Sequence, residues 1–455
     1  MPVVGVGASA GGLDALTQLV QALPADSGLV IVVLQHMAAD HESSLPYLLA
    51  RASKLQVIEA TQGARLQANC IYVVPPNAQM EISGDRLVLS RRPADRTRHT
   101  PIDTFFASLA LSARSKAIAI VLSGTGSDGA LGIRDIKAAG GITIAQRPET
   151  AKYDSMPRMA IDTGMVDLVL SPEEAGAELA RIAQHPYVRL RPSQVDDAIG
   201  DDNLAAIFDL LKPIAGIDFQ QYKQGTIRRR LARRMALNRL DAVDAYIKLL
   251  RSSTEERRGL FQDLLIHVTR FFREPESFAA LADDVLPKLL ERHGPERPLR
   301  MWVCGCATGE EAYSLAITAI EHIEKHQLDV RVQIFATDVS DTAIEHARAG
   351  IYPATITADV SPARLRRFFV RSDGSYRVSK QIRDLCVFAR QDLTKDPPFS
   401  RLDLIMCRNV LIYMETALQK RLIGIFHYAL NQPGYLVLGH AETVGSQAAL
   451  FTIAD

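Results

Sequence analysis

Short apolar runs rich in valine and isoleucine alternate with amphipathic stretches through residues 1–187. The runs PVVGVG, GLVIVVLQH, NCIYVVPP, AIAIVLSG and GITIAQ each predict a buried strand. Helical spacing between them is clearest in LDALTQLVQALP and GALGIRDIKAAG. Apolar strands separated by helices predict a mainly parallel, doubly wound sheet. The more alternating RLVLSRR predicts an edge strand or a hairpin.

The pattern changes after residue 187. Residues 188–202 carry no clear period and include a proline, so we expect a linker. Residues 203–293 show no strand, and LAAIFDLL, YKQGTIRRRLARRMALNRL, AVDAYIKLLRSS and FAALADDVLPKLLERH all have helical spacing. This stretch predicts a small all-α domain.

Strands return in residues 294–455, as LRMWVCG, VQIFATD, LCVFARQD, LDLIMCRN and GYLVLGH. A small β-insertion is expected near residues 364–383, closed by Asp373-Gly374. The predicted fold class is therefore α/β, with two doubly wound, mainly parallel sheets separated by the all-α domain. The last residues, FTIAD, read as the start of another strand, so we expect the natural protein to continue.

Composition narrows the function only a little. Lys+Arg and Asp+Glu both total 52, so no global charge draws the chain to nucleic acid or an anionic membrane. Five scattered cysteines predict reduced thiols rather than a disulfide framework, and no metal site is expected. No apolar run reaches the ~20 residues of a membrane span, and no signal peptide is visible. We expect a cytoplasmic protein.

Three polar residues follow predicted strands of the first sheet. Ser9 lies in GASAGG after the first strand, His36 follows the second, and Asp128 lies in SGTGSDGA. Each residue also has a structural interpretation without catalysis: Ser9 in a tight turn, His36 as a packed histidine and Asp128 as a helix cap. Open parallel sheets place sites at these strand ends, however, where the three can act as nucleophile, base and orienting acid.

The pieces GASAGG, LQHM and SGTGSDGA resemble the catalytic domain of bacterial chemotaxis receptor methylesterases (CheB type). The resemblance implies hydrolysis of glutamate methyl esters with Ser9, His36 and Asp128 as the catalytic triad. The family often has methionine where this chain has Thr125, at the glycine-rich loop.

The second α/β segment opens with a G-x-x-x-G turn at residues 305–309, where a ligand can approach the backbone closely. Asp338 ends the next strand, where it can accept hydrogen bonds from ribose hydroxyls or cap the following helix. A full dinucleotide fingerprint is missing, and S-adenosylmethionine, which has no pyrophosphate, does not need one.

The signatures VTRFFRE, WVCGCATGEEAYSLAI, ATDVS, CRNVLIY and GHAE resemble chemotaxis receptor methyltransferases (CheR type) over residues 203–455. The resemblance implies S-adenosyl-L-methionine as cofactor and the methylation of glutamate carboxylates. It departs at His267 and at Asp392, where the family frequently has asparagine. By motif match, the cofactor site is expected to contain Thr269, Arg273, Glu310, Asp338, Asp392, Leu393, Cys407 and Arg408, with Asn409 and Tyr413 beside them.

A basic stretch lies in the helical segment, above an apolar stripe of Ile227, Leu231 and Met235. It is a solvated face, a nucleic-acid surface or, as the resemblance implies, a surface for acidic receptor helices. Few aromatics and zero net charge argue against nucleic acid. The basic residues are Lys223, Arg228, Arg229, Arg230, Arg233, Arg234 and Arg239.

Three functions stay open at this point. The favoured one is a bifunctional enzyme that acts on the cytoplasmic helices of chemoreceptors, without membrane insertion. The second keeps the methyltransferase but treats the first segment as an inactive regulatory or docking module. The third is a nucleic-acid methyltransferase guided by the basic helix.

Overall fold

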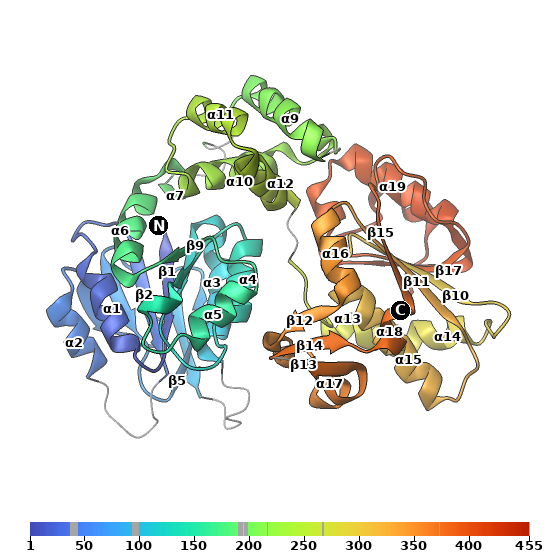
Figure 1. The fold of residues 1–455 in the computed structure, drawn as a ribbon, viewed down its shortest axis with the longest axis horizontal. Coiled ribbons are helices and arrows are strands. Elements are labelled where there is room, and N and C mark those ends of the chain that lie inside the picture. The colour runs from blue at the N-terminus through green and yellow to red at the C-terminus, as the bar shows by residue number, and fades with distance from the viewer. Residues whose placement is uncertain are drawn as a thin grey trace. The chain divides into compact units, whose positions relative to one another are not determined.

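The computed structural model describes residues 1–36, 44–92, 100–189, 194, 199–215, 217–265, 268–372 and 374–454. The chain divides into two compact units, drawn in Figure 1. The first unit contains residues 1–210 and 227–268, and the second contains residues 211–226 and 269–455. Most of the helical segment therefore packs with the first sheet and not with the second.

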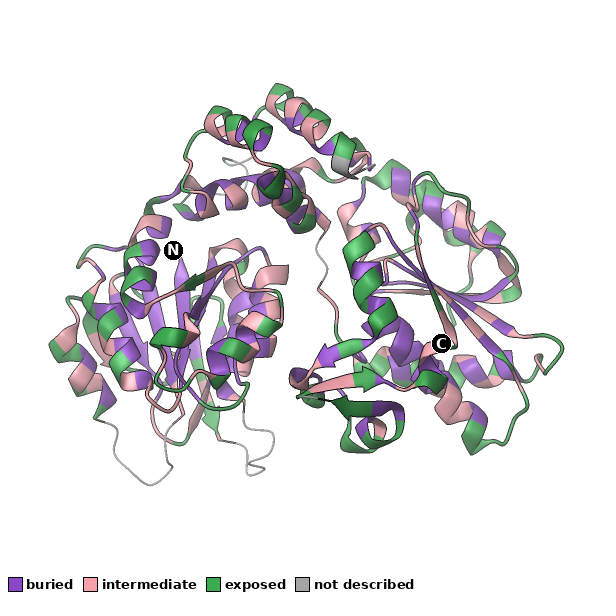
Figure 2. Cartoon of the chain, viewed as in Figure 1, coloured by how far each residue is buried: buried purple, intermediate pink, exposed green. Residues whose placement is uncertain are grey.

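The first unit is built on a seven-stranded sheet in which every pairing is parallel. All five apolar runs are strands of it, and sequence reasoning missed only the two short edge strands, β3 and β9. Its central strands are buried because helices cover both faces (Figure 2). The order is β3 (Gln56–Glu59), β4 (Cys70–Val73), β2 (Val30–Gln35), β1 (Val3–Ala8), β7 (Ala117–Val121), β8 (Ile142–Gln146) and β9 (Leu168–Leu170).

Helices form a layer on each face of this sheet, which confirms the doubly wound prediction (Figure 1). One layer is α1 (Gly12–Gln21), α2 (Leu45–Ala52) and α6 (Pro172–Gln184). The other layer is α3 (Pro101–Ala113), α4 (Ala130–Ala138) and α5 (Ser155–Asp162). RLVLSRR is in a hairpin, β5 (Ala78–Ser83) with β6 (Arg86–Arg91), which packs on α3.

The helical segment contains a helix that was not expected, α12 (Thr254–Leu265). Three expected helices are α9 (Asp201–Ala215), α10 (Gln224–Leu237) and α11 (Val243–Ser252), and the short α7 (Pro186–Arg189) precedes them. Helix α12 was missed because its few apolar positions are interrupted by charged ones. The expected linker overlaps α7 and α9, and its residues 190–193 and 195–198 lie outside the described part of the chain.

The second unit holds a five-stranded sheet, again with all pairings parallel. In the central strand, Met301 and Val303 pack into the core on one face, and Trp302 and Cys304 into the core on the other. Alternate side chains thus bury both faces. The strand order is β15 (Cys386–Arg390), β11 (Val332–Asp338), β10 (Leu299–Cys304), β16 (Leu402–Cys407) and β17 (Leu430–Leu438).

Helices also cover both faces of the second sheet. Helix α19 (Thr416–Ala429) packs on the Trp302 face. The helices on the opposite face are α13 (Pro275–Ala280), α14 (Leu286–Leu290), α15 (Glu310–Lys325) and α16 (Asp341–Ala349), with a π-helical turn over 281–285.

The β-insertion is wider than predicted. It is a three-stranded antiparallel sheet of β12 (Ile351–Pro353), β14 (Ser375–Val378) and β13 (Phe369–Ser372). Helices α17 (Pro362–Phe368) and α18 (Lys380–Arg383) flank it, so part of the segment expected to be β is helical. Asp373 of the expected turn lies outside the described residues.

Two further expectations concern whole segments. Residues 451–454 form no strand, so the reading of FTIAD as the start of one was wrong. Within the described ranges, none of the helices has the length and apolarity required to cross a lipid bilayer.

The basic face of α10 is largely used inside the first unit, which corrects its interpretation as an open surface. Arg230 and Arg233 are buried, and Arg234 is paired with Glu256 of α12. Arg228 pairs with Asp201. Arg230, Arg233 and Arg234 are therefore not available to an acidic receptor helix or to phosphates.

Candidate active sites

Strand pairing brings the three candidate esterase residues to one edge of the first sheet. β1 lies between β2 and β7, and all three run parallel. Ser9 directly follows β1 and His36 directly follows β2. Asp128 reaches the same edge from the turn between β7 and α4. Backbone bonds fix the register, since the N–H of His36 donates to the carbonyl of Ala8 at 3.2 Å.

The three side chains form a continuous hydrogen-bonded chain. Nδ1 of His36 lies 3.1 Å from Oγ of Ser9, and Nε2 lies 2.8 Å from Oδ2 of Asp128. Asp128 is 7% exposed. The neutral imidazole can accept from the serine hydroxyl while donating to the carboxylate, which is the geometry of an activated nucleophile. The ring nitrogens are used in the opposite sense to the chymotrypsin triad.

Asp128 is itself held by a second aspartate that sequence reasoning missed. Its two oxygens accept from the N–H groups of Ile102 and Asp103, at 3.0 and 2.9 Å. In return, Oδ1 of Asp103 accepts from the N–H groups of Gly129 and Gly132, at 2.9 and 2.7 Å. Each aspartate caps the helix that carries the other. Burial, and then the neighbouring Asp128, raise the pKa of Asp103 well above its usual value.

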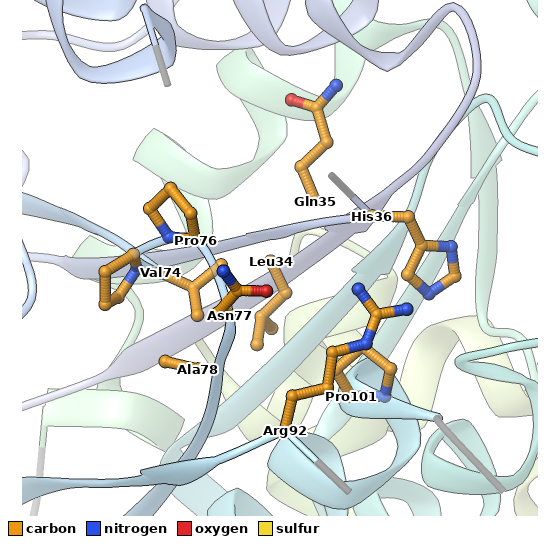
Figure 3. Close-up of a pocket in the computed structure, with 10 residues that line it drawn as sticks. Leu34, Gln35, His36, Val74, Pro76, Asn77, Ala78, Arg92 and Pro101 are labelled. Atoms are coloured by element: carbon orange, nitrogen blue, oxygen red, sulfur yellow. The ribbon is translucent and has the colours of Figure 1, made fainter. Parts of the chain in front are cut away.

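A hollow of about 170 Å³ adjoins the imidazole (Figure 3). Its walls combine apolar side chains, among them Leu34 and Val74, with polar Asn77 and the cation of Arg92. His36 forms part of the same wall. A segment bound at Ser9 thus has a partly apolar space beside it that also presents a positive charge.

The candidate cofactor site lies at the corresponding edge of the second sheet. The carboxylate of Asp338 accepts from the N–H groups of Ala307 and Ser340, both at 2.9 Å. Asp338 therefore anchors the backbone on both sides of this sheet edge, whereas the side chain of Ser340 caps the following helix, α16. Glu310 begins α15 and accepts from the hydroxyl of Thr308 at 2.6 Å.

Two buried side-chain oxygens that directly follow β15 accept no hydrogen bond. Oδ1 of Asp392 accepts from the N–H and hydroxyl of Thr394, whereas the buried Oδ2 has no hydrogen-bond partner. The side-chain oxygen of Gln391 is in the same condition. Buried acceptors are normally satisfied, so a ligand that donates hydrogen bonds fits here.

Tyr222 joins this site from outside the second α/β segment, and no sequence signal pointed to it. It pairs with Met414 in an antiparallel bridge, and the N–H of Lys223 donates to the carbonyl of Tyr413 at 2.9 Å. Burial, then the carboxylates of Asp392 and Asp338, raise the pKa of Tyr222. The phenol of Tyr222 is therefore close enough to feel the charge of Asp392 and of Asp338.

The loop after β16 is held by one carboxylate. Glu442 accepts four backbone N–H bonds, from Asn409, Val410, Leu411 and Gly439, at 2.7, 2.8, 2.7 and 2.8 Å. The motif GHAE contains Glu442, but its role is visible only in the structure. The side-chain oxygen of Asn409 is buried without a partner.

Other expected cofactor residues divide into two groups. Cys407 is fully buried in the core with Trp302, so only its backbone can face a ligand. Leu393 packs on the same core. Thr269 and Tyr413 are partly buried, and His267 lies outside the described residues.

Arg408 is the centre of a buried charge cluster. Its guanidinium contacts Glu274 at 2.6 Å and Glu311 at 3.3 Å, and Nε has no partner. Glu274 thus faces Arg408, while Glu276 faces His440 at 3.0 Å. Burial raises the pKa of Glu311 to about 7, even though Arg408 and Arg273 oppose the shift.

These features fit S-adenosylmethionine. Unpaired buried acceptors suit its amino and hydroxyl donors, and carboxylates suit its positively charged sulfonium and amino groups. Residues that would hold it are Asp338, Asp392, Asn409 and Tyr222. The bound cofactor supplies an electrophilic methyl group.

The two edges are thus a candidate serine-triad hydrolase site on one sheet and a candidate methyl-transfer site on the other. Sequence comparison identifies the family of each segment. Residues 4–179 match the CheB methylesterase family, residues 202–265 the all-alpha domain of CheR methyltransferase, and residues 267–455 its SAM binding domain. The chain therefore belongs to the chemotaxis methyltransferase family, with a CheB methylesterase domain joined to it, and S-adenosylmethionine is its cofactor.

Two relatives match different shares of this chain. The "Uncharacterized 104.1 kDa protein in hypE 3'region" of Rhodobacter capsulatus is 40% identical over 87% of this chain and 44% of that protein. This chain thus spans less than half of that relative's length. Chemotaxis protein methyltransferase 2 of Vibrio cholerae is 30% identical over 56% of this chain and 90% of that protein.

A similar solved structure covers the first segment. The Thermotoga maritima CheB methylesterase catalytic domain is 29% identical, covering 40% of this chain and 98% of that one, with a TM-score of 0.37.

The aspartate pair makes a first prediction. Asp103→Asn keeps an oxygen for the two glycine N–H groups, so kcat for ester hydrolysis should stay within about threefold of wild type. Asp103→Ala leaves both N–H groups unpaired, at roughly 1–3 kcal/mol each, and should lower kcat at least about tenfold. Steady-state kinetics decide. Equal loss in both variants would mean that an ionised Asp103 is required.

The loop after β16 makes a second prediction. Glu442→Gln replaces one acceptor oxygen by an N–H₂ donor that opposes backbone N–H groups, so the loop loosens. The dissociation constant for S-adenosylmethionine, measured by calorimetry, should rise about tenfold or more. Ester hydrolysis by the same chain is the internal control and should not change. Unaltered affinity contradicts a role for this loop in binding.

Glu311 makes a third prediction, on pH. Its raised pKa means that the folded state binds more protons than the unfolded state between about pH 4.5 and 7. Its contribution to stability is therefore present at low pH and is lost as pH rises through 7. Glu311→Gln should unfold at a higher temperature than wild type at pH 8 and at the same temperature at pH 5. Calorimetric scans test this, and a pH-independent difference rejects it.

Proposed function

We propose that this chain both removes and adds methyl groups at glutamate side chains of chemoreceptor cytoplasmic helices. The observation that carries the first half is the Ser9–His36–Asp128 hydrogen-bonded chain. The observation that carries the second half is the set of unpaired acceptors beside Asp338, in a domain of the CheR family. A cytoplasmic location agrees with both substrates.

Ester hydrolysis follows from the triad geometry. Oγ of Ser9 adds to the ester carbonyl carbon while its proton passes to Nδ1 of His36. Asp128 holds the imidazole by Nε2 and stabilises its positive charge. The proton then moves to the leaving oxygen as the carbon–oxygen bond breaks, which releases methanol. Water, activated in the same way, cleaves the acyl-serine and frees the glutamate.

Methyl transfer to the glutamate requires no general base from the protein. A glutamate carboxylate, with an ordinary pKa of about 4.3, is ionised at neutral pH and needs no base to attack a methyl group. The residues around Arg408 and Asn409 need only to position the carboxylate in line and exclude water.

The first experiment separates the two activities. The chain is incubated with methyl-labelled S-adenosylmethionine and candidate receptor cytoplasmic domains, and methanol is collected as volatile counts. Wild type should label the receptor and release methanol. Ser9→Ala should retain at least as much label on the receptor but lower methanol release by at least about 1,000-fold.

The controls separate the alternatives. Methanol release that is absent in wild type favours an inactive esterase-like module. Label that appears on nucleic acid and resists mild base favours a nucleic-acid methyltransferase, because carboxyl methyl esters are base-labile. Arg251→Met, an exposed change on α11, should behave as wild type.

A further inference from the structure

Four charged side chains, of which Lys137 is the most exposed at 17%, join the helical segment to the esterase sheet. Arg233 of α10 is fully buried and contacts Asp263 of α12 at 2.6 Å and Asp167 before β9. Lys137 of α4 contacts Asp167 and lies 3.2 Å from Asp263. Two residues come from the esterase and two from the helical segment, and their formal charges cancel.

The esterase side of this cluster is built firmly into the sheet. Asp167 also accepts from the N–H and the hydroxyl of Thr143, at 3.0 and 2.9 Å. The guanidinium of Arg233 donates in addition to the carbonyl of Gly141 at 2.9 Å. The neighbouring cations outweigh burial and hold the pKa of Asp167 well below its usual range. The cluster is thus a closed set of ionised, hydrogen-bonded groups.

More contacts surround it along the same face. Arg230 donates to the carbonyls of Lys137 and Ala138, at 3.3 and 3.1 Å, where α4 ends. Arg181 of α6 donates to the carbonyl of Ala236 at 2.6 Å, and Nε2 of His185 lies 3.0 Å from the carbonyl oxygen of Leu240. Cations at a helix C-terminus pair with its unsatisfied carbonyls and its negative dipole end.

Helix α4 connects this surface to the triad. It has nine residues and begins two residues after Asp128, and its other end carries Lys137 and the carbonyls that Arg230 binds. At ~1.5 Å per residue it is a rod of about 14 Å. Gly132 lies so close to Phe106 that an added Cβ would meet the Cβ of Phe106 at 2.4 Å and its ring at 3.0 Å, so α4 has little room to shift.

We propose that α10–α12 are a structural part of the esterase, and that Arg233 and Arg230 are positioning residues which fix α4 and, through it, Asp128. The segment that matches a methyltransferase domain thus serves the opposing enzyme in this chain. Arg230 and Arg233 are committed to that internal surface and are not part of a docking face.

The test uses variants of the full-length chain that first disturb and then restore the neutral charge of this cluster. Arg233→Met removes the cation but keeps much of the volume, which leaves two buried carboxylates against one ammonium. Arg233→Met with Asp263→Asn restores neutrality around Lys137 and Asp167. Exposed Arg251→Met is the control. Hydrogen exchange of α4 and α12 is measured, together with kcat and KM for methyl-ester hydrolysis.

Arg233→Met should speed exchange in both α4 and α12 by about tenfold or more, since an unpaired buried charge opens the contact. It should lower kcat more than KM, and the double variant should recover most of both. Affinity for S-adenosylmethionine should stay unchanged. Faster exchange limited to α10–α12, with α4 and kcat as in wild type, overturns the proposal. So does a double variant worse than the single one.

Arg230→Met covers the case in which Arg233→Met does not fold. It should speed exchange at the end of α4, near residues 137–141, and lower kcat moderately. Unchanged exchange there overturns the proposal as well. The kinetic part rests on the proposed esterase activity, but the exchange part does not. If the wild-type chain has no esterase activity, the proposed function is rejected. The hydrogen-exchange test of the contact between α4 and α10–α12 still applies.

Discussion

Parallel pairing of the central strand with both neighbours is the constraint on which each site depends. In the first sheet β1 lies between β2 and β7, and in the second β10 lies between β11 and β16. Three adjacent strands that run parallel must end at the same edge, so the residues that follow them meet there. Ser9 and His36 are 27 residues apart in the chain but hydrogen-bonded for this reason.

The strand ends bring residues close, and carboxylates that accept backbone N–H bonds then fix the loops. Asp103 and Asp128 each bond the backbone of the helix that carries the other, so neither helix start can move independently. Glu442 does the same for the loop after β16 by collecting four N–H donors. Hydrogen bonds from charged groups are stronger than neutral ones, which explains why single side chains suffice.

The strands and the triad could be predicted because their signals are local or positional. Apolar runs such as AIAIVLSG mark buried strands, and the polar residue after each run marks the edge. Asp103 and Glu442 could not be found in this way, since each acts on backbone groups whose location depends on the tertiary fold. Tyr222 was missed because it precedes α10 in sequence and is joined to the second unit's site by tertiary contacts such as its bridge to Met414.

The same reasoning explains why the basic helix was misread. Periodicity showed that Ile227, Leu231 and Met235 share a face, and all three are buried. It could not show that Arg233 lies fully buried as well, because its partner Asp167 is 66 residues away and on a strand edge. A buried arginine is tolerable only with carboxylates already in place, so the esterase sheet had to supply Asp167 for α10 to pack there. Charge runs in a sequence therefore indicate a binding surface only after the acidic groups of the same fold have been counted.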